Sequence, residues 1–500
     1  MKRNKRTLIV LAVVVIVLVA AILALLLPDQ LSGDTASSSV SSSTTSTLYE
    51  YASKDLKSLQ VKNKSGSFTI VPDAEATAKA ESEAAASAAS SASSAATATV
   101  DTVFKVQELE GLPLNTSAVA SAAKDGYVFA TVKTVTTAED DQLENYGLTD
   151  STATAKWTST FTNGTTKTLL VGSQTPLDST SYYVREEGSN TVYAANVDSS
   201  LLGSVTGLVS NNVTNYQAPD DDAGTGASTA SSPFQQIAIT NQQGSFTLSR
   251  SGKGADWSVD GQPASGDAVS TLSSGLAALT ADSVAAIHPD SAALTKYGFN
   301  APAAKASLKL LDGSSQTLLI GGTDSDGKYY AMLQGGQVVY LLPSSGLSWL
   351  TQSAIDLRDL KILSNEVTDI ASFQITGSKS YDFEVTRKED TASSTEDNKS
   401  YTYSATVNGK AVSDYSTYET FFTAAANLQI LEAAGANDKP SGTPAQTITL
   451  TGYDKSVHHV YQFYTSGNRR YLVVADGKVF GLMNVSDFDA LLESEPFPKK

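Results

Sequence analysis

The chain has 500 residues, about three times the roughly 150 residues of a typical domain, so several domains are expected. Its 52 acidic and 35 basic residues give a formal net charge of -17, which argues against a nucleic-acid-binding surface. Because the chain has no cysteine, disulfides, zinc sites with cysteine ligands, iron-sulfur clusters and a lipid anchor on cysteine are excluded. The hydrophobic content of 41% predicts packed cores over most of the length.

A basic tail followed by an apolar run opens the chain. Four Lys or Arg residues within positions 1–6 precede residues 7–27, which are uncharged and mostly Leu, Ile, Val and Ala. A helix of this length spans about 30 Å, one hydrocarbon thickness, and exceeds the apolar part of a signal peptide. We therefore expect residues 1–27 to form a cytoplasmic tail and an uncleaved, single-pass transmembrane helix. By the positive-inside rule, the rest of the chain lies outside the cytoplasm, at the cell membrane.

Internal repeats are the most informative feature of the remaining chain. The sequence Leu-Glu-Asn-Tyr-Gly-Leu at 143–148 reappears as Leu-Thr-Lys-Tyr-Gly-Phe at 294–299. Gly-Ser-Phe also occurs twice, starting at Gly66 and at Gly244. The first copy is longer between these two landmarks, and an Ala/Ser-rich insertion at about 74–100 accounts for the difference. We interpret this insertion as a solvated loop without large apolar residues, with an Ala/Glu helix and a coil both left open.

A third, divergent copy follows the second. Its first strands are expected at 373–377 and 381–387, and its last at 477–482, which resembles 336–341. It lacks the Tyr-Gly sequence and carries a charged insertion at 390–399.

These features predict the domain organisation. Residues 28–47 are dominated by Ser and Thr and predict a flexible tether. Residues 218–233, with three consecutive aspartates among Gly, Ser and Thr, predict a linker. We expect module 1 at 48–217, module 2 at 234–363 and the divergent module 3 at 364–495. No spacer separates modules 2 and 3, so we expect them to pack together.

The pattern of module 2 predicts an α+β fold. Alternating residues at 237–239 and 246–248 flank a turn, Trp-Ser-Val at 257–259 adds a short strand, and further strands at 305–311, 317–320, 329–333 and 338–342 form an antiparallel meander. Asp267 is the expected N-cap of a helix that buries Val269, Leu272, Leu276 and Leu279. A second short helix, 291–297, ends at Gly298. Each tandem module is therefore expected to pack a helix pair against a mainly antiparallel sheet.

Candidate chemistry is sparse. His458 and His459 are adjacent, so on a strand they point to opposite faces and do not readily share a metal, and His288 has no histidine nearby. The Asp-Ser-Asp-Gly sequence at 324–327 lacks the later Glu of a calcium loop and predicts a tight hairpin turn. No nucleophile elbow, dinucleotide fingerprint, P-loop or zinc-protease sequence occurs. We expect a protein that is not an enzyme and has no catalytic, cofactor or metal site.

Two tyrosine pairs are the candidate binding residues. On a strand, one member of each pair faces the core and the other faces outward, where a ring could stack on a glycan or a partner protein. The alternative is cross-strand packing. The candidates are Tyr182, Tyr183, Tyr329 and Tyr330. At the junction of modules 2 and 3, Arg358 and Asp359 are candidates for joining the two modules.

Module 2 also carries a set of structural landmarks. They are the strand pair ending near Arg250, Trp-Ser-Val at 257–259, the helix after Asp267, Tyr-Gly-Phe at 297–299 with Pro302, Leu-Ile-Gly at 319–321 and residues 355–359. With these landmarks module 2 resembles the bacterial domain-of-unknown-function family numbered 4340, and modules 1 and 3 are similar to divergent members. The resemblance implies a membrane-anchored, exported protein, because such proteins are typically anchored and some are encoded beside ABC-type transport components. The family has no established catalytic residues.

The functional expectation is a non-enzymatic, membrane-anchored extracytoplasmic binding or scaffold protein. The partner that the resemblance implies is an ABC-type permease, with another envelope protein as a further option, and no nucleic acid is expected. The alternative is a cell-envelope surface protein that binds wall glycan through the tyrosine pairs.

Overall fold

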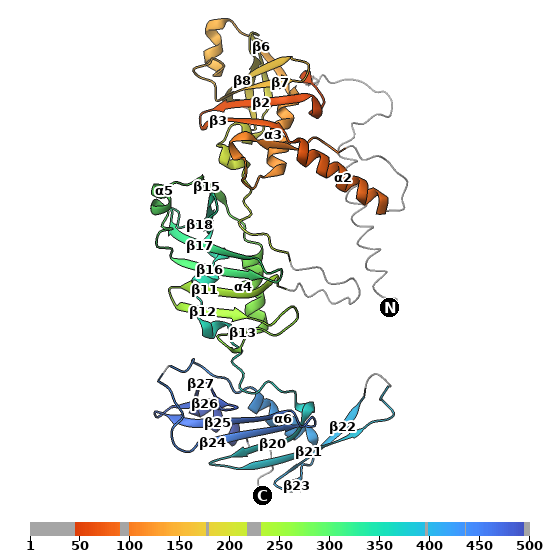
Figure 1. Ribbon diagram of the computed structural model, residues 1–500, viewed down its shortest axis with the longest axis vertical. Helices are drawn as coiled ribbons and strands as arrows, with labels where there is room; N and C mark the ends of the chain where they lie inside the picture. The colour runs from red at the N-terminus through yellow and green to blue at the C-terminus, as the bar shows by residue number, and fades with distance from the viewer. Residues whose placement is uncertain are drawn as a thin grey trace, which may run out of the picture.

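The computed structural model describes residues 46–90, 100–176, 180–217, 232–395, 399–435 and 437–494. Within these residues, the strands form three large antiparallel sheets, one after another along the molecule, and one two-stranded pair (Figure 1). The predicted transmembrane helix and most of the predicted tether and linker lie outside the described residues. None of the helices in the described part has both the length and the apolar character needed to cross a membrane.

The first sheet has the strand order β4-β3-β2-β7-β8-β9-β10-β6. Its strands are β2 (Leu56–Asn63), β3 (Gly66–Pro72), β4 (Phe104–Val106), β6 (Lys133–Thr137), β7 (Ala155–Phe161), β8 (Thr166–Gln174), β9 (Ser181–Glu186) and β10 (Thr191–Asn196). Helix α3 (Thr116–Tyr127) covers one face of this sheet, and β1 (Ser46–Glu50) pairs with β5 (Val128–Thr131) at its margin.

The second sheet has the order β14-β13-β12-β11-β16-β17-β18-β19-β15. Its strands are β11 (Phe234–Asn241), β12 (Gly244–Ser249), β13 (Ser258–Val259), β14 (Gln262–Pro263), β15 (Ser283–Ile287), β16 (Ala304–Leu310), β17 (Ser315–Thr323), β18 (Tyr329–Leu333) and β19 (Val338–Leu342). Its helices are α4 (Gly266–Ala277) and α5 (Ser291–Lys296). The predicted hairpin, short strand and meander are confirmed, and the edge strand β15 is an addition that the sequence pattern did not predict.

The third sheet has the order β23-β22-β21-β20-β24-β25-β26-β27. Its strands are β20 (Ile370–Thr376), β21 (Tyr381–Glu389), β22 (Tyr401–Val407), β23 (Lys410–Ala411), β24 (Gln446–Gly452), β25 (His458–Ser466), β26 (Arg470–Ala475) and β27 (Lys478–Asn484). Helices α6 (Tyr415–Ala426) and α7 (Val485–Glu493) both pack into one core with this sheet. The predicted strands at 373–377, 381–387 and 477–482 correspond to β20, β21 and β27.

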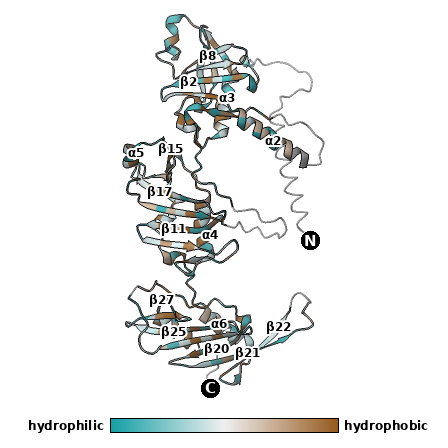
Figure 2. Ribbon diagram, viewed as in Figure 1, coloured by the Kyte–Doolittle hydropathy of each residue, from teal (hydrophilic) through white to brown (hydrophobic). Residues whose placement is uncertain are grey.

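The three sheets share one topology. In each, a hairpin pairs through its first strand with a four-stranded meander, as in β12-β11-β16-β17-β18-β19 and β21-β20-β24-β25-β26-β27. Strands β7 and β24 alternate buried and half-buried residues, and β16 alternates buried and exposed ones, which is the period of two that buries one face of a sheet. The same mixed hydropathy runs along the strands in Figure 2. We call the face that packs against α3, α4 or α6 the inner face, and the opposite face the outer face.

The expected helix pair is not present in module 2, because its two helices lie on opposite faces of the sheet (Figure 1). Helix α4 buries Val269, Leu272 and Leu276 in the inner core. The segment around α5 instead packs Leu294 and Phe299 into a separate small cluster on the outer face. The hydrophobic period of α4 predicted its buried side correctly, but it could not show which face of the sheet the helix covers.

Two further expectations are corrected. The insertion in module 1 is not a loop over its first part, because α2 (Ala74–Ser90) is a helix. Alanine is the strongest helix former, and Asp73 caps the first turn by accepting from the Ala76 N–H at 3.1 Å. The N-cap of α4 is Ser265, which accepts from the Ala268 N–H, so Asp267 lies in the first turn.

The Tyr-Gly sequences are explained by a close contact on the outer face. Gly298 has a φ of 85° and Gly147 a φ of 69°, so each turn needs the left-handed conformation. A Cβ added to Gly321 would lie only 2.1 Å from the carbonyl oxygen of Tyr297. A Cβ added to Gly172 would lie at the same distance from the carbonyl oxygen of Tyr146. In module 2, Ile320 pairs with the first residue of β16, and Gly321 follows it. In module 3, Phe463 pairs with the first residue of β24, so the next residue, Tyr464, is equivalent to Gly321. Module 3 therefore lacks both halves of the contact.

The connection between modules 2 and 3 is docked on both sides. The Asp359 N–H donates to the Pro263 carbonyl of module 2, and the Ile362 N–H donates to the Leu428 carbonyl of module 3. Arg358 is 8% exposed, donates to the Phe480 carbonyl at 2.7 Å and lies 4.9 Å above the Phe480 ring. Arg358 therefore joins the two modules through a carbonyl and an aromatic ring, and no residue in the described part of the chain forms an ion pair with it.

Candidate binding surface

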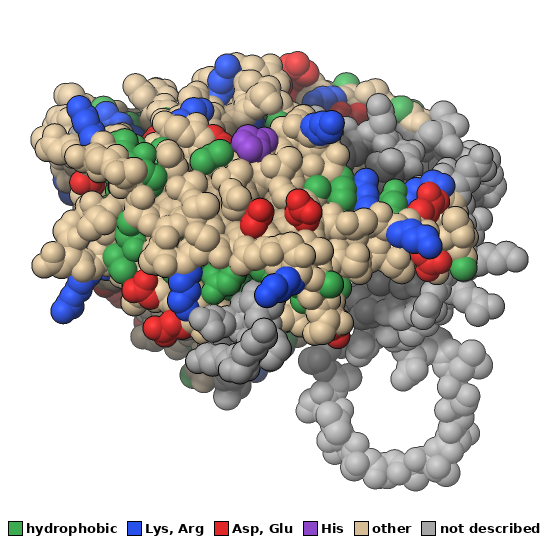
Figure 3. Space-filling model, turned by 90° about the horizontal axis from the view of Figure 1, so that it is seen from below, with side chains coloured by type: hydrophobic (Ala, Val, Ile, Leu, Met, Phe, Trp, Pro, Cys, Tyr) green, Lys and Arg blue, Asp and Glu red, His purple; other side chains and the backbone are tan. Residues whose placement is uncertain are grey.

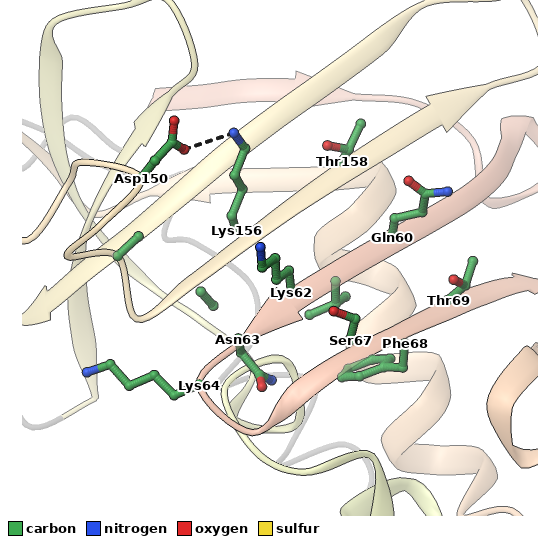
Figure 4. Close-up of a pocket in the computed structure, with 13 residues that line it drawn as sticks. Gln60, Lys62, Asn63, Lys64, Ser67, Phe68, Thr69, Asp150, Lys156 and Thr158 are labelled. Atoms are coloured by element: carbon green, nitrogen blue, oxygen red, sulfur yellow. Dashed lines mark hydrogen bonds and ion pairs between the residues drawn. The ribbon is translucent and has the colours of Figure 1, made fainter.

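The outer face of module 1 is only half covered. The 3-10 helix η3 (Asp140–Tyr146) packs Leu143 and Tyr146 over strands β8, β9 and β10. No described residue covers the outer face of β3, β2 and β7 in this way, and a groove of about 610 Å³ lies along these strands (Figure 4). Polar side chains dominate its lining: Gln60, Lys62, Asn63, Lys64, Ser67, Thr69, Asp150, Lys156 and Thr158.

One of the three groove lysines is neutralised by neighbours. Lys156 lies 3.0 Å from Asp150 and 2.7 Å from Glu187, and these hydrogen bonds raise the pKa of the Lys156 ammonium. The bond from Lys156 also lowers the pKa of Asp150. Lys62 and Lys64 are exposed, and neither makes an ion pair with any residue that the structure describes. Lys62 also helps to lower the pKa of Asp150, so its charge is partly offset. With three lysines facing the carboxylates of Asp150 and Glu187, the groove keeps a net positive charge in a chain whose net charge is negative.

Asn63 lines the groove but has a structural role. Its side-chain amide donates to the Leu201 and Gly203 carbonyls, and its Oδ1 accepts from the Ser65 N–H. Asn241 repeats this arrangement in module 2, where it donates to the Trp349 and Gln352 carbonyls. The shared spacing of Asn, Gly, Ser and Phe at the two hairpins was the sequence signal for this pair, which our sequence analysis missed.

The structure separates the members of each tyrosine pair. Tyr182 and Tyr329 pack against the inner core, whereas Tyr183 and Tyr330 lie on the outer face. There the Tyr183 ring centroid is 5.0 Å from that of Tyr146, and the Tyr330 ring centroid is 4.6 Å from that of Tyr297. All four side chains are half-buried. Ring packing is thus established for Tyr183 and Tyr330, and a role in binding stays a prediction for all four tyrosines.

A smaller hollow of about 220 Å³ adjoins the outer tyrosine of module 1. Its lining combines Tyr183 with apolar and basic residues of the neighbouring strands, among them Val132, Lys133, Val135 and Ala194. An aromatic wall beside a cation is a combination that can hold a sugar ring or a small polar group.

The histidines make ordinary polar contacts. His459 Nδ1 lies 2.8 Å from Asp476 Oδ2, and His458 Nδ1 lies 3.1 Å from Thr451 Oγ1. Although burial acts to raise the pKa of Asp476, the hydrogen bonds from His459 and from the Val460 N–H lower it overall. No three His, Asp or Glu side chains gather into a metal-binding group within the described ranges.

Asp324 accepts from the Asp326 and Lys328 N–H groups, which confirms the predicted hairpin turn. Figure 3 shows acidic and basic side chains interspersed at the end of the molecule that is seen from below.

One carboxyl group in module 1 titrates unusually. Asp125, near the end of α3, is largely removed from water, and this burial raises the pKa of Asp125 to about 6, although the Asp198 N–H donates to it at 2.9 Å. Its ordinary value is 3.8, so the folded state holds a proton that the unfolded state releases between these two values. The carboxyl therefore lowers stability as the pH rises from about 4 to about 6, and the loss is complete above that range.

We expect Asp125→Asn to be more stable than the unmodified chain at pH 8 by about 1–3 kcal/mol, with no difference below about pH 4. The amide oxygen keeps an acceptor for the Asp198 N–H, so only the charge is removed. Urea unfolding between pH 4 and pH 8 measures this difference. The control is Asp141→Asn on the exposed side of η3, and equal pH profiles for the two variants would contradict the prediction.

Comparison with known proteins gives one match. The model of a family described as a domain of unknown function (DUF4340) matches residues 104–256 and again residues 257–446. Each match begins within one module and ends in the next, after β12 in the first case and at the start of β24 in the second. No curated protein and no solved structure matches the chain significantly.

Proposed function

Because the chain belongs to the DUF4340 family, whose model covers more than half of it in two consecutive matches, we propose a role shared by its tandem modules. The protein is a non-enzymatic, membrane-anchored scaffold whose modules present sheet surfaces to a partner outside the cytoplasm. The membrane anchor in this proposal rests on the sequence of residues 1–27, whose basic tail and apolar run predict a cytoplasmic tail and a single transmembrane helix.

The observation that carries the scaffold role is the way the repeated sheets are joined. Residues 210–213 connect modules 1 and 2 and form hydrogen bonds with both. The Ser210 N–H donates to the Pro113 carbonyl of module 1, and the Val213 N–H donates to the Leu279 carbonyl of module 2. The connector between modules 2 and 3 is docked in the same manner through Asp359 and Ile362. Docked connectors hold successive surfaces in a constant arrangement, which suits an extended binding surface.

The partner class follows from the family resemblance. Some proteins similar to this family are encoded beside ABC-type transport components, so the proposed partner is the outer face of an ABC-type permease. A membrane anchor places the modules at the surface where such a permease is exposed.

Site-specific crosslinking in native membranes tests the scaffold role. A photoreactive amino acid replaces Ser307, which is exposed on the outer face of module 2, in the full chain with a C-terminal tag. The matched control carries it at Thr271, on the exposed side of α4. We expect crosslinks to a permease from position 307 and none from position 271. Failure to crosslink any membrane protein from position 307 would count against the proposal.

The hollow beside Tyr183 favours a second candidate function, glycan binding at the outer tyrosines. Its test is the binding of purified wall polymers by the chain and by Tyr183→Leu, which keeps apolar packing against Tyr146 but removes the ring. Unchanged binding by this variant would eliminate the tyrosine as the site.

A further inference from the structure

The groove of module 1 lies over the middle of a sheet. Strand β2 pairs with β3 and β7, and β3 and β7 pair with β4 and β8 on their other sides. Along the groove, β2 and β7 are therefore paired on both sides, whereas β3 pairs with β4 only over Ile70–Pro72 and the Thr69 N–H donates to the Glu108 carboxylate. A peptide lying across β2 and β7 could not bind by adding a strand. A ligand must be recognised through the side chains that stand on the outer face.

Those side chains combine cations with hydrogen-bonding groups. Lys62 and Lys64 supply two ammonium groups without ion-pair partners among the described residues. Gln60 adds an amide, and Ser67 and Thr69 add hydroxyls along the same groove (Figure 4). The volume of about 610 Å³ falls within the range of sites for small ligands.

The apolar residues of these strands face the other way. Val61 and Phe68 are 2% exposed and belong to the inner core, so neither offers a pocket for the anchor side chain of a bound peptide. The other apolar residues of the lining, Ala153 and Ala155, are small. A polyhydroxylated ligand needs no such anchor, because hydroxyls hydrogen-bond to amides and hydroxyls and its anionic groups pair with lysine.

The two hairpin lysines of module 1 have no counterparts at the same hairpin of module 2. In module 1, Lys62 and Lys64 flank the structural Asn63. In module 2, the equivalent Asn241 is flanked by Thr240 and Gln242. The two modules share the fold of this hairpin and differ in the chemistry that it presents. Folding alone therefore does not require these lysines.

We propose that the groove along β3, β2 and β7 binds an anionic polyol chain, made of sugar or glycerol units that bear carboxylate or phosphate groups. Lys62 and Lys64 pair with the anionic groups, and Gln60, Ser67 and Thr69 bond to the hydroxyls. Lys156 stays with Asp150 and Glu187 and forms the wall of the groove. This site is independent of the permease partner proposed above.

Binding measurements on the full chain in detergent micelles test the site. The probes are polygalacturonate for carboxylate, poly(glycerol phosphate) for phosphate, dextran as a neutral polyol and poly-glutamate as an acidic peptide. We expect binding of one or both anionic polyols, weakened by added salt, and none of dextran. The probe that binds more tightly identifies the anionic group.

The decisive variant is Lys62→Gln with Lys64→Gln, and its matched control is Lys305→Gln with Lys309→Gln on the exposed outer face of β16. The first pair is expected to lose about tenfold in affinity or more, and the control pair to bind as the unmodified chain does. Equal affinity of the two double variants, binding of poly-glutamate as tight as that of the polyols, or no binding of either anionic polyol would overturn the proposal. Crosslinking from position 307 is unaffected by the lysine changes, so the two proposals fail separately.

Discussion

Gly321→Ala is expected to destabilise module 2 by about 3 kcal/mol or more, because the added Cβ meets backbone that cannot move aside. The Tyr297 carbonyl lies 2.1 Å from the Cβ position, and the same carbonyl accepts a hydrogen bond from the Gly322 N–H at 2.8 Å. Relief of the clash would lift the Tyr-Gly turn off the sheet and open the outer cluster around Phe299. Urea unfolding of the full chain measures the loss.

The control for this substitution is Gly275→Ala, on the exposed side of α4. No atom lies within 4 Å of its Cβ position, and alanine is the better helix former, so stability should stay equal or rise by up to about 1 kcal/mol. Gly172→Ala should reproduce the loss in module 1, where the Tyr146 carbonyl is equally close. A Gly321→Ala chain as stable as the Gly275→Ala chain would refute the packing argument.

Arg358→Ala is expected to uncouple module 3 from module 2, with a loss of about 2–3 kcal/mol. The change removes a hydrogen bond to the Phe480 carbonyl and the packing of the guanidinium over the Phe480 ring. Burial in this position lowers the pKa of Arg358, which shows how far the group is removed from water. Limited proteolysis should then cut the connector between Leu357 and Leu363 faster, and module 3 should unfold in a separate transition.

Two variants separate the contact from the charge. Lys361→Ala, an exposed change in the same connector, should leave proteolysis and unfolding unchanged. Arg358→Lys keeps the charge but loses the planar group that stacks on Phe480. Its connector should therefore be cut at a rate between those of Arg358→Ala and Lys361→Ala. If Arg358→Ala were cut no faster than Lys361→Ala, Arg358 would not be the residue that joins the modules.

The candidate binding surface was only partly accessible to sequence reasoning. The tyrosine pairs could be found by repetition, because Tyr183 and Tyr330 occupy equivalent strands and contact equivalent partners. The groove could not, because the pairing of β2 with β7 brings Lys62 opposite Lys156, and residues 94 positions apart give no local signal of this contact. Arg358 was visible as a charged residue at a junction, but its acceptor, Phe480, lies 122 positions further along the chain.

The sequence by itself determined the repetition, the antiparallel meander of module 2 and the buried positions of its main helix. These features follow from local patterns: a period of two in the strands, a helical spacing in α4, and glycines where the backbone needs a positive φ. Only the tertiary structure decided that α4 and α5 lie on opposite faces, that half of the outer face of module 1 stays open, and that Arg358 reaches module 3. A hydrophobic period shows that a face is buried but not what buries it, because the partner is set by contacts between residues far apart in the chain.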